Sequence, residues 1–273
     1  RQYPLKNEYI SEGFLLNKLK TSLSLRNSPL SIDTKLLTNI YLNNLKSATH
    51  WVVKRNNIGL ILSNTLKEED SKALQSAIHF SNILKVSEVE SVRNEAGQAI
   101  VKIMPKLTSF EKNDVAVELL RSLEIEGHKF TEYIPIYLGQ VLLFLEENEL
   151  DEVIEDLHLK IKTSNPDVKT LILKTVAITI QHFLAGISLD HITDNQYNRL
   201  IKLLGILLNG LGDYDEQINI SALSYFSKGI FQSTYIDLQK KHYIYALTAK
   251  KLLTLIYPDN ESKLLLLSNS AAL

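Results

Sequence analysis

The 273-residue chain contains no cysteine and is poor in glycine (10) and proline (6). The lack of cysteine excludes disulfide frameworks, thiolate nucleophiles and cysteine-ligated zinc or iron–sulfur sites. It is compatible with a cytoplasmic location, which we expect. Strand signals are also scarce, because no sustained alternation of apolar and polar residues is bounded by turn residues. These absences point to an all-α protein.

The chain also lacks an excess of charge of either sign. It has 30 basic and 31 acidic residues, whereas dedicated nucleic-acid binders usually carry a strong basic excess that neutralises phosphates. A nucleic-acid partner is therefore not expected. The most apolar stretch, residues 171–184, is interrupted by Lys174, Gln181 and His182. We expect no transmembrane segment, since a span needs about 20 mostly apolar residues.

Apolar residues recur at the i, i+3, i+4, i+7 spacing of amphipathic helices over most of the chain. A first helix is expected over residues 7–24, followed by a loop and by Asp33 as an N-cap. The further helices are expected over residues 33–46, 48–65, 71–85, 89–104, 111–123, 130–146, 149–162, 167–185, 194–209, 215–231, 236–257 and 260–268. Short connections between them predict antiparallel neighbours.

One pattern returns in every second helix. Taking Val92 as position zero, similar registers begin at Val53, Ile134, Val168 and Ile218, with a mean spacing of about 41 residues. The residues four and eight positions later are mostly apolar, as a buried face requires: Asn57, Ala96, Leu138, Ile172 and Ala222 at position four, and Ile61, Ile100, Leu142, Val176 and Phe226 at position eight.

The segment from Ser91 to Ile103 resembles the second helix of a HEAT repeat, whose pattern is Val-Arg-x-x-Ala-x-x-x-Leu. The resemblance extends roughly over residues 33–231. It implies a right-handed α-α superhelix, a HEAT/armadillo-like solenoid of about five to six helix pairs, forming a single domain over residues 1–273. Residues 1–32 would then be an N-terminal capping helix and loop, and residues 232–273 would be C-terminal capping helices.

The resemblance also implies that basic residues one position after the register start join a ladder of charges between repeats. Lys54, Arg93 and Lys169 occupy that position here. The alternative architecture is an ordinary helical bundle with accidental similarity. Because the sequence does not begin with methionine, we expect it to be part of a longer protein.

Specific catalytic and ligand motifs are missing. The sequence has no P-loop, no H-E-x-x-H and no G-x-S-x-G. Gly210 and Gly212 are interpreted as a helix end, and Asp213 and Asp215 as a turn with acids at a helix N-terminus. The acidic run over residues 146–156 is interpreted as a solvated edge that could also bind a basic partner. We therefore expect no catalytic residue, no metal site and no cofactor.

In HEAT solenoids the second helix of each pair lines the concave face. If positions zero, four and eight are buried, the opposite face lies near positions three, six and ten. The candidate binding residues on this face are Gln98, Lys102, Tyr137, Gln140, Phe144, Lys174 and Lys228. The alternative is that Phe144, Leu171 and Ile178 are buried between repeats.

The predicted function is a non-enzymatic protein–protein interaction scaffold that binds a peptide or helix on its concave face. Two alternatives remain at this point. One is a HEAT-like enzyme that acts on nucleic acid, of the DNA glycosylase type, which requires a basic concave groove. The other is a purely architectural spacer. The sequence gives no information on the oligomeric state.

Overall fold

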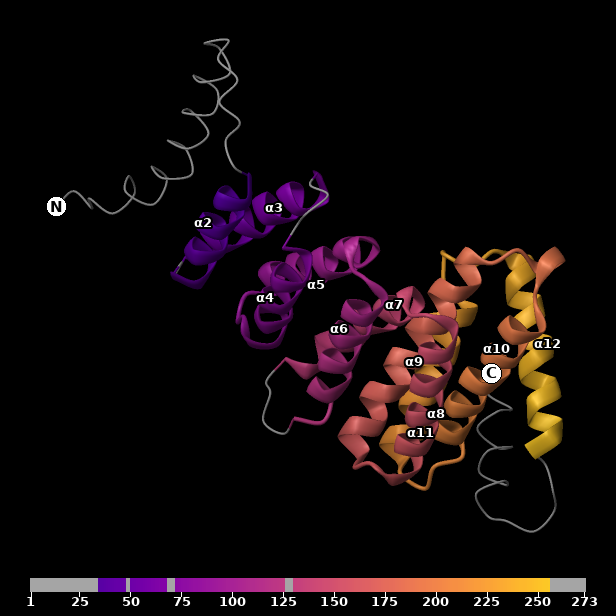
Figure 1. Cartoon of the computed structure of the whole chain (residues 1–273). Helices are drawn as coiled ribbons and strands as arrows, with labels where there is room; N and C mark the ends of the chain where they lie inside the picture. The colour runs from indigo at the N-terminus through magenta and orange to yellow at the C-terminus, as the bar shows by residue number, and fades with distance from the viewer. Residues whose placement is uncertain (1–33, 48–49, 68–71, 126–129, 256–273) are drawn as a thin grey trace.

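The computed structural model describes residues 34–47, 50–67, 72–125 and 130–255 (Figure 1). Within these ranges the chain forms helices and turns and no strand, which confirms the all-α class for the described part. The helices expected over 7–24 and 260–268, and the Asp33 cap, lie outside the described residues.

Except for the segments predicted over 130–146 and 215–231, the described α-helices match the predicted ranges to within three residues at each end. They are α2 (Thr34–Ser47), α3 (Trp51–Lys67), α4 (Ala73–Val86), α5 (Glu90–Ile103), α6 (Ser109–Ser122), α7 (Ile134–Val141), α8 (Glu147–Thr163), α9 (Pro166–Gly186), α10 (Asp194–Leu211), α11 (Glu216–Ser224) and α12 (Leu238–Leu255).

Two predicted helices are less regular than expected. The segment predicted over 130–146 is a short helix α7 between two 3₁₀ turns, η3 (Thr131–Tyr133) and η4 (Leu142–Phe144). Pro135 lies in the first turn of α7, where its missing N–H removes no helical hydrogen bond. The segment predicted over 215–231 begins as α11 and continues as a π-helix, η6 (Tyr225–Phe231).

Polar side chains start several of these helices. Thr108, Asn165, Thr193 and Asp215 each accept a hydrogen bond from a backbone N–H in the first turn of the helix that follows. Such caps satisfy donors that have no partner within the helix. The interpretation of Asp215 as an acid at a helix N-terminus is therefore confirmed, and Gly212 ends α10 as expected.

The helices form two layers along an elongated body (Figure 1). Each even-numbered helix packs against the odd-numbered helix that follows it, from α2 with α3 to α10 with α11. The odd helices also pack in sequence, α3 on α5, α5 on α7, α7 on α9 and α9 on α11, and we call them the odd-helix layer. The even helices pack as α4 on α6, α8 on α10 and α10 on α12, and form the even-helix layer.

The repeated register predicted from the sequence coincides with the helices of the odd-helix layer. Its five starting residues lie in the first turn of α3, α5, α7, α9 and α11, the members of the odd-helix layer. Val53 is half-buried, and the other four starts and all residues at positions four and eight are buried. The buried face predicted from the sequence is thus confirmed for each unit.

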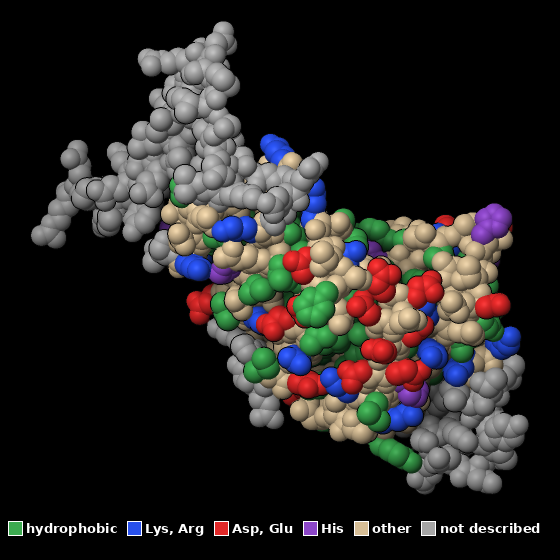
Figure 2. Space-filling model, in the orientation of Figure 1, with side chains coloured by type: hydrophobic (Ala, Val, Ile, Leu, Met, Phe, Trp, Pro, Cys, Tyr) green, Lys and Arg blue, Asp and Glu red, His purple; other side chains and the backbone are tan. Residues whose placement is uncertain are grey.

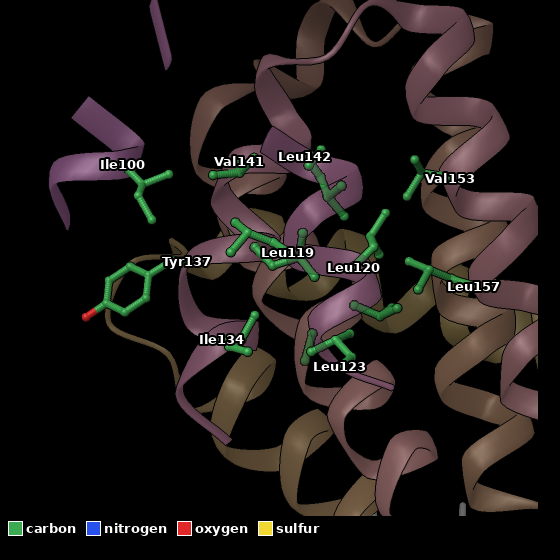
Figure 3. Close-up of a cluster of buried hydrophobic side chains, with 14 of the residues drawn as sticks. Ile100, Leu119, Leu120, Leu123, Ile134, Tyr137, Val141, Leu142, Val153 and Leu157 are labelled. Atoms are coloured by element: carbon green, nitrogen blue, oxygen red, sulfur yellow. The ribbon is translucent and has the colours of Figure 1, made fainter. Parts of the chain in front are cut away.

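The core is continuous along the stack. Figure 3 shows side chains of α5, α6, α7 and α8 in its middle part. Leu119 and Leu120 of α6, with Leu123 just after that helix, lie between the labelled side chains of α7 and those of α8. Removing a leucine or isoleucine side chain from water stabilises the fold by about 1.5–3 kcal/mol each. Burial of this kind holds the two layers together.

Helix α9 is both long and apolar. It has 21 residues, and an 18-residue window within it has a mean hydropathy of 1.3, which makes it the one helix among the described residues that is long and apolar enough to cross a membrane. Core helices of other proteins also have such a composition. Here α9 contacts α7, α8, α10 and α11, and its apolar residues contribute to the shared core.

Candidate functional site

The open face of the odd-helix layer follows from helical geometry. With about 100° per residue, positions zero, four and eight point together toward the even helices, and position six points almost directly away. Gln98, Gln140 and Lys174 occupy position six on α5, α7 and α9. Gln98 is exposed, and Gln140 and Lys174 are half-buried. The side chains at position six therefore form a row along the odd-helix layer on the side that faces away from the even helices.

Position three is turned toward the preceding odd helix, so the expectation that Tyr137 lines an open surface was wrong. Tyr137 is only 5% exposed. Its ring lies against Gly97 of α5, and its hydroxyl donates to Asn94 Oδ1 at 3.0 Å. Burial raises the pKa of Tyr137, with a further contribution from Glu90 and Glu95. The residue holds α5 and α7 together.

The apolar candidates follow the alternative that the sequence left open. Phe144, Leu171 and Ile178 are half-buried. Phe144 and Leu171 pack against the core, and Ile178 lies over Gly139 of α7. Lys102 and Lys228 are exposed, on α5 and on η6. These candidates do not gather at one place on the layer.

One groove does open on the odd-helix layer, beside the N-terminal half of α9, with a volume of about 600 Å³. We call it the α9 groove. It brings together the end of α6, the turn before α7, α9, and the α11–η6 segment. Its lining residues are Leu123, Glu124, Ile125, Thr131, Glu132, Asn165, Asp167, Val168, Thr170, Leu171, Lys174, Gln217 and Tyr225. Among the predicted binding residues, Lys174 is the one that lies here.

Lys174 is held across this groove. Its Nζ donates to the backbone carbonyl of Glu132 at 2.7 Å. Burial lowers the pKa of Lys174, and the Glu132 carboxylate acts in the opposite direction. Burial raises the pKa of Tyr225, which also feels the Glu132 charge. The carboxylates of Glu124, Glu132 and Asp167 line the groove. Glu124 is paired with Lys160 at 2.6 Å, so the acidic excess of the groove over its single lysine comes from Glu132 and Asp167.

The acidic run over residues 146–156 has intramolecular partners instead of forming a purely solvated edge. Arg199 of α10 binds Asp151 through Nε at 2.8 Å and Glu147 through Nη2 at 3.4 Å. Lys202 pairs with Glu155. The hydrogen bond from Arg199 lowers the pKa of Asp151 despite partial burial. These pairs join α8 to α10.

The basic residues one position after the register start make two different kinds of contact. Lys169 of α9 pairs with Asp213, in the turn before α11, at 2.8 Å. Arg93 donates to the carbonyl of Ser87 at 2.7 Å and lies over the rings of Phe130 and Tyr133. Lys169 therefore makes a charge contact of the kind that the resemblance implies, and Arg93 serves packing.

Several groove residues were missed by sequence reasoning. Ile125, Glu132 and Tyr225 come from a turn and from the start of the π-helix, outside the positions that the register defines. Only the contact between neighbouring units places them beside Lys174. Among the described residues, no group of three or more histidine, aspartate or glutamate side chains is arranged to hold a metal ion.

Comparison with known proteins gave few matches. No protein-family model matches the chain, and no curated protein matches its sequence. A similar solved structure is that of a microtubule polymerase with an array of Tumor Overexpressed Gene (TOG) domains, described for tubulin recruitment and assembly. The TM-score is 0.46 at 14% identity, and the match covers 85% of this chain. The chain spans about half (51%) of that protein.

Proposed function

We propose that the chain is a protein-binding scaffold, a HEAT-like right-handed superhelix of about five to six helix pairs, and that the α9 groove binds a peptide segment of its partner. The observation that carries the proposal is the groove itself. The groove opens beside the row of position-six side chains on the odd-helix layer. Its lining residues come from three successive units.

The repeat architecture is supported by two features. The same buried register starts in five successive odd helices, and each odd helix packs on the next. In repeat proteins each unit contacts its neighbours and the stack presents one extended surface for binding. Counting the helix pairs from α2–α3 to α10–α11 gives five units, with α12 as an additional helix.

The chemistry of the groove favours a peptide with a basic side chain. Glu132 and Asp167 are exposed carboxylates on its lining, and Leu171 and Ile125 offer apolar contact beside them. A lysine or arginine of the partner would form charge-assisted hydrogen bonds with these carboxylates. Further along the layer, the side-chain amide of Gln98 carries both donors and an acceptor for a peptide backbone.

The alternatives receive less support. A DNA glycosylase would need a groove that attracts phosphates, whereas this groove holds three carboxylates and one lysine. A pure spacer needs no groove at all. The cytoplasmic location and the single-domain organisation stay predictions.

The proposal is tested by selecting peptides from a random display library on the full chain and measuring their affinity by fluorescence anisotropy. We expect selected peptides to be rich in lysine or arginine. The double variant Glu132→Lys, Asp167→Lys should weaken their binding at least tenfold, since two attractive charges become repulsive.

The matched control is Glu88→Lys, Asp190→Lys, which makes the same change of net charge at exposed positions outside the groove. Its affinity for the peptides should stay within about twofold of the wild type. Equal loss of binding in both double variants, or failure to select any peptide, would contradict the proposal.

A further inference from the structure

Glu132, one of the two carboxylates that give the α9 groove its acidic excess, lies in a short turn. This is the 3₁₀ turn η3, and Thr131 and Glu132 of it line the groove. A turn of three residues makes few hydrogen bonds of its own; here the N–H of Tyr133 donates to the carbonyl of Phe130 at 3.2 Å. The position of the Glu132 carboxylate therefore depends on the contacts that neighbouring helices make with this turn.

Arg93 of α5 holds the turn from the preceding unit. Its Cζ lies 4.2 Å from the centre of the Phe130 ring and 4.1 Å from the centre of the Tyr133 ring. These two aromatic residues flank the groove residues of the turn in the sequence. The same guanidinium donates through Nη1 to the carbonyl of Ser87 at 2.7 Å, which fixes it to the segment just before α5.

The contact between Arg93 and the two rings is buried. Arg93 is only 3% exposed, and its Nε is buried without a hydrogen-bond partner. A guanidinium is attracted to the face of an aromatic ring, and this attraction is stronger where water is excluded. Removal of the cation would therefore loosen the turn on the side of α5.

Lys174 of α9 holds the same turn from the following unit, through its hydrogen bond to the backbone carbonyl of Glu132. Lys174 lines the groove, whereas no residue of α5 does. The turn that carries Glu132 is thus held by one cation of α5 and one of α9. Through Arg93, α5 acts on a groove to which it contributes no lining side chain.

We propose that Arg93 is a positioning residue for peptide binding, and that it fixes the Glu132 carboxylate where a basic side chain of the partner meets it. This inference rests on the proposed function of the α9 groove. A carboxylate that is already in place binds a cation more tightly than one that must first be ordered. The dependence of peptide affinity on Glu132 should therefore require Arg93.

A double-mutant cycle measures this requirement. The probe is a labelled peptide selected on the full chain, and its affinity is measured by fluorescence anisotropy at about 0.15 M salt. In the wild type, Glu132→Gln should weaken binding roughly fivefold, because a charge-assisted hydrogen bond is lost. In the Arg93→Met background the same substitution should weaken binding less than about twofold. A general loss of stability would lower the affinity without removing the dependence on Glu132.

Lys85→Met provides the matched background. Lys85 is a buried cation of the same helix pair, pairs with Glu118 and does not line the α9 groove. In this background Glu132→Gln should keep its full effect. Two further variants test the contact itself, and circular dichroism shows whether each variant is folded. Arg93→Lys keeps a cation and should retain part of the effect, and Tyr133→Leu removes one ring and should reduce the effect.

A separate control measures attraction by acidic side chains elsewhere. Figure 2 shows such side chains spread around apolar ones over the middle of the visible face, where Figure 1 places α6 and α8. Glu152→Gln removes one exposed carboxylate of α8. It should change the affinity less than about twofold, both in the wild type and in the Arg93→Met background.

Three results would overturn the inference. The first is an equal effect of Glu132→Gln in the wild type and in Arg93→Met, which would leave the proposed function intact. The second is an equally reduced effect in Lys85→Met and Arg93→Met, which would show that the role is not specific to Arg93. The third is no effect of Glu132→Gln in the wild type, while the proposed function is judged by its own double variant of Glu132 and Asp167.

Discussion

Gly97 marks the closest approach between α5 and α7. A Cβ atom at this position would lie 2.3 Å from ring carbons of Tyr137, and that ring is itself buried. We predict that Gly97→Ala lowers the free energy of unfolding by about 1–3 kcal/mol, because the ring must leave its place. Chemical denaturation measures the change.

Gly59 provides the control for this prediction. It lies within α3, and nothing surrounds its missing Cβ within 4 Å. Gly59→Ala should raise the free energy of unfolding by about 0.5–1 kcal/mol, because alanine loses less conformational freedom in a helix. If both substitutions changed stability equally, the close packing of Tyr137 on α5 would be wrong.

The ion pair between Asp151 and Arg199 predicts a pH dependence. The hydrogen bond from Arg199 lowers the pKa of Asp151 in the folded chain below its ordinary value. The contribution of this pair is therefore complete above about pH 4, where the carboxyl of the unfolded chain is ionised, and is lost as the pH falls through the lower folded pKa.

We expect the free energy of unfolding to fall less steeply below pH 4 in Asp151→Asn than in the wild type. Denaturation at a series of pH values measures this slope. Glu152→Gln, at the next and exposed position of α8, serves as control and should keep the wild-type slope. The same slope in Asp151→Asn and the wild type would show that the pair does not persist in solution.

At the scale of the element, capping residues fix where helices begin. Thr193 accepts a hydrogen bond from the N–H of Gln196, whose side chain in turn accepts from the N–H of Thr193. We predict that Thr193→Ala lowers the free energy of unfolding by about 1 kcal/mol. Asn198→Ala, at an exposed position of the same helix, should change it by less than about 0.5 kcal/mol. Thermal unfolding of both variants would decide, and equal midpoints would contradict the cap.

Most of these elements could be predicted from the sequence. Periodic apolar residues and polar breaks place the helices, because both features depend on neighbours within about one turn. The register also predicted the buried face correctly at Ala96, Leu138 and Ile172. Local patterns of this kind are therefore sufficient to predict where the helices lie and which face of each is buried.

The binding surface was predicted less well, for a physical reason. Periodicity gives the direction of a side chain about its own helix, but the neighbour that covers it depends on how helices stack. Tyr137 is covered by α5 for this reason, and Lys174 remains partly open. Tyr225 and Glu132 reach the α9 groove through tertiary contacts that no local pattern encodes.

At the scale of the whole molecule, the first described helix pairs differ from the later ones in how they are packed. Buried side-chain atoms of Asn57, Asn64, Thr65 and Ser76, on α3 and α4, have no hydrogen-bond partner. Each unpartnered buried polar group destabilises its surroundings by about 1–3 kcal/mol. By contrast, α9 and α10 are lined with buried leucine and isoleucine.

We therefore predict that α3 opens before α9. Because each helix pair contacts mainly its neighbours, one end of a stack can open without the rest. Native-state hydrogen exchange should give amides of α3 an opening free energy roughly 2 kcal/mol below that of amides in α9. A single value for both helices would show that the described chain unfolds as one cooperative unit.

The account depends most on the claim that the odd-helix layer is a binding surface with its centre at the α9 groove. Hydrogen exchange of the full chain, with and without a peptide selected on it, tests this claim directly. We predict added protection in α7, in the N-terminal half of α9 and in η6, and none in α4 or α12. Protection confined to the even-helix layer, or spread evenly over the chain, would contradict the account.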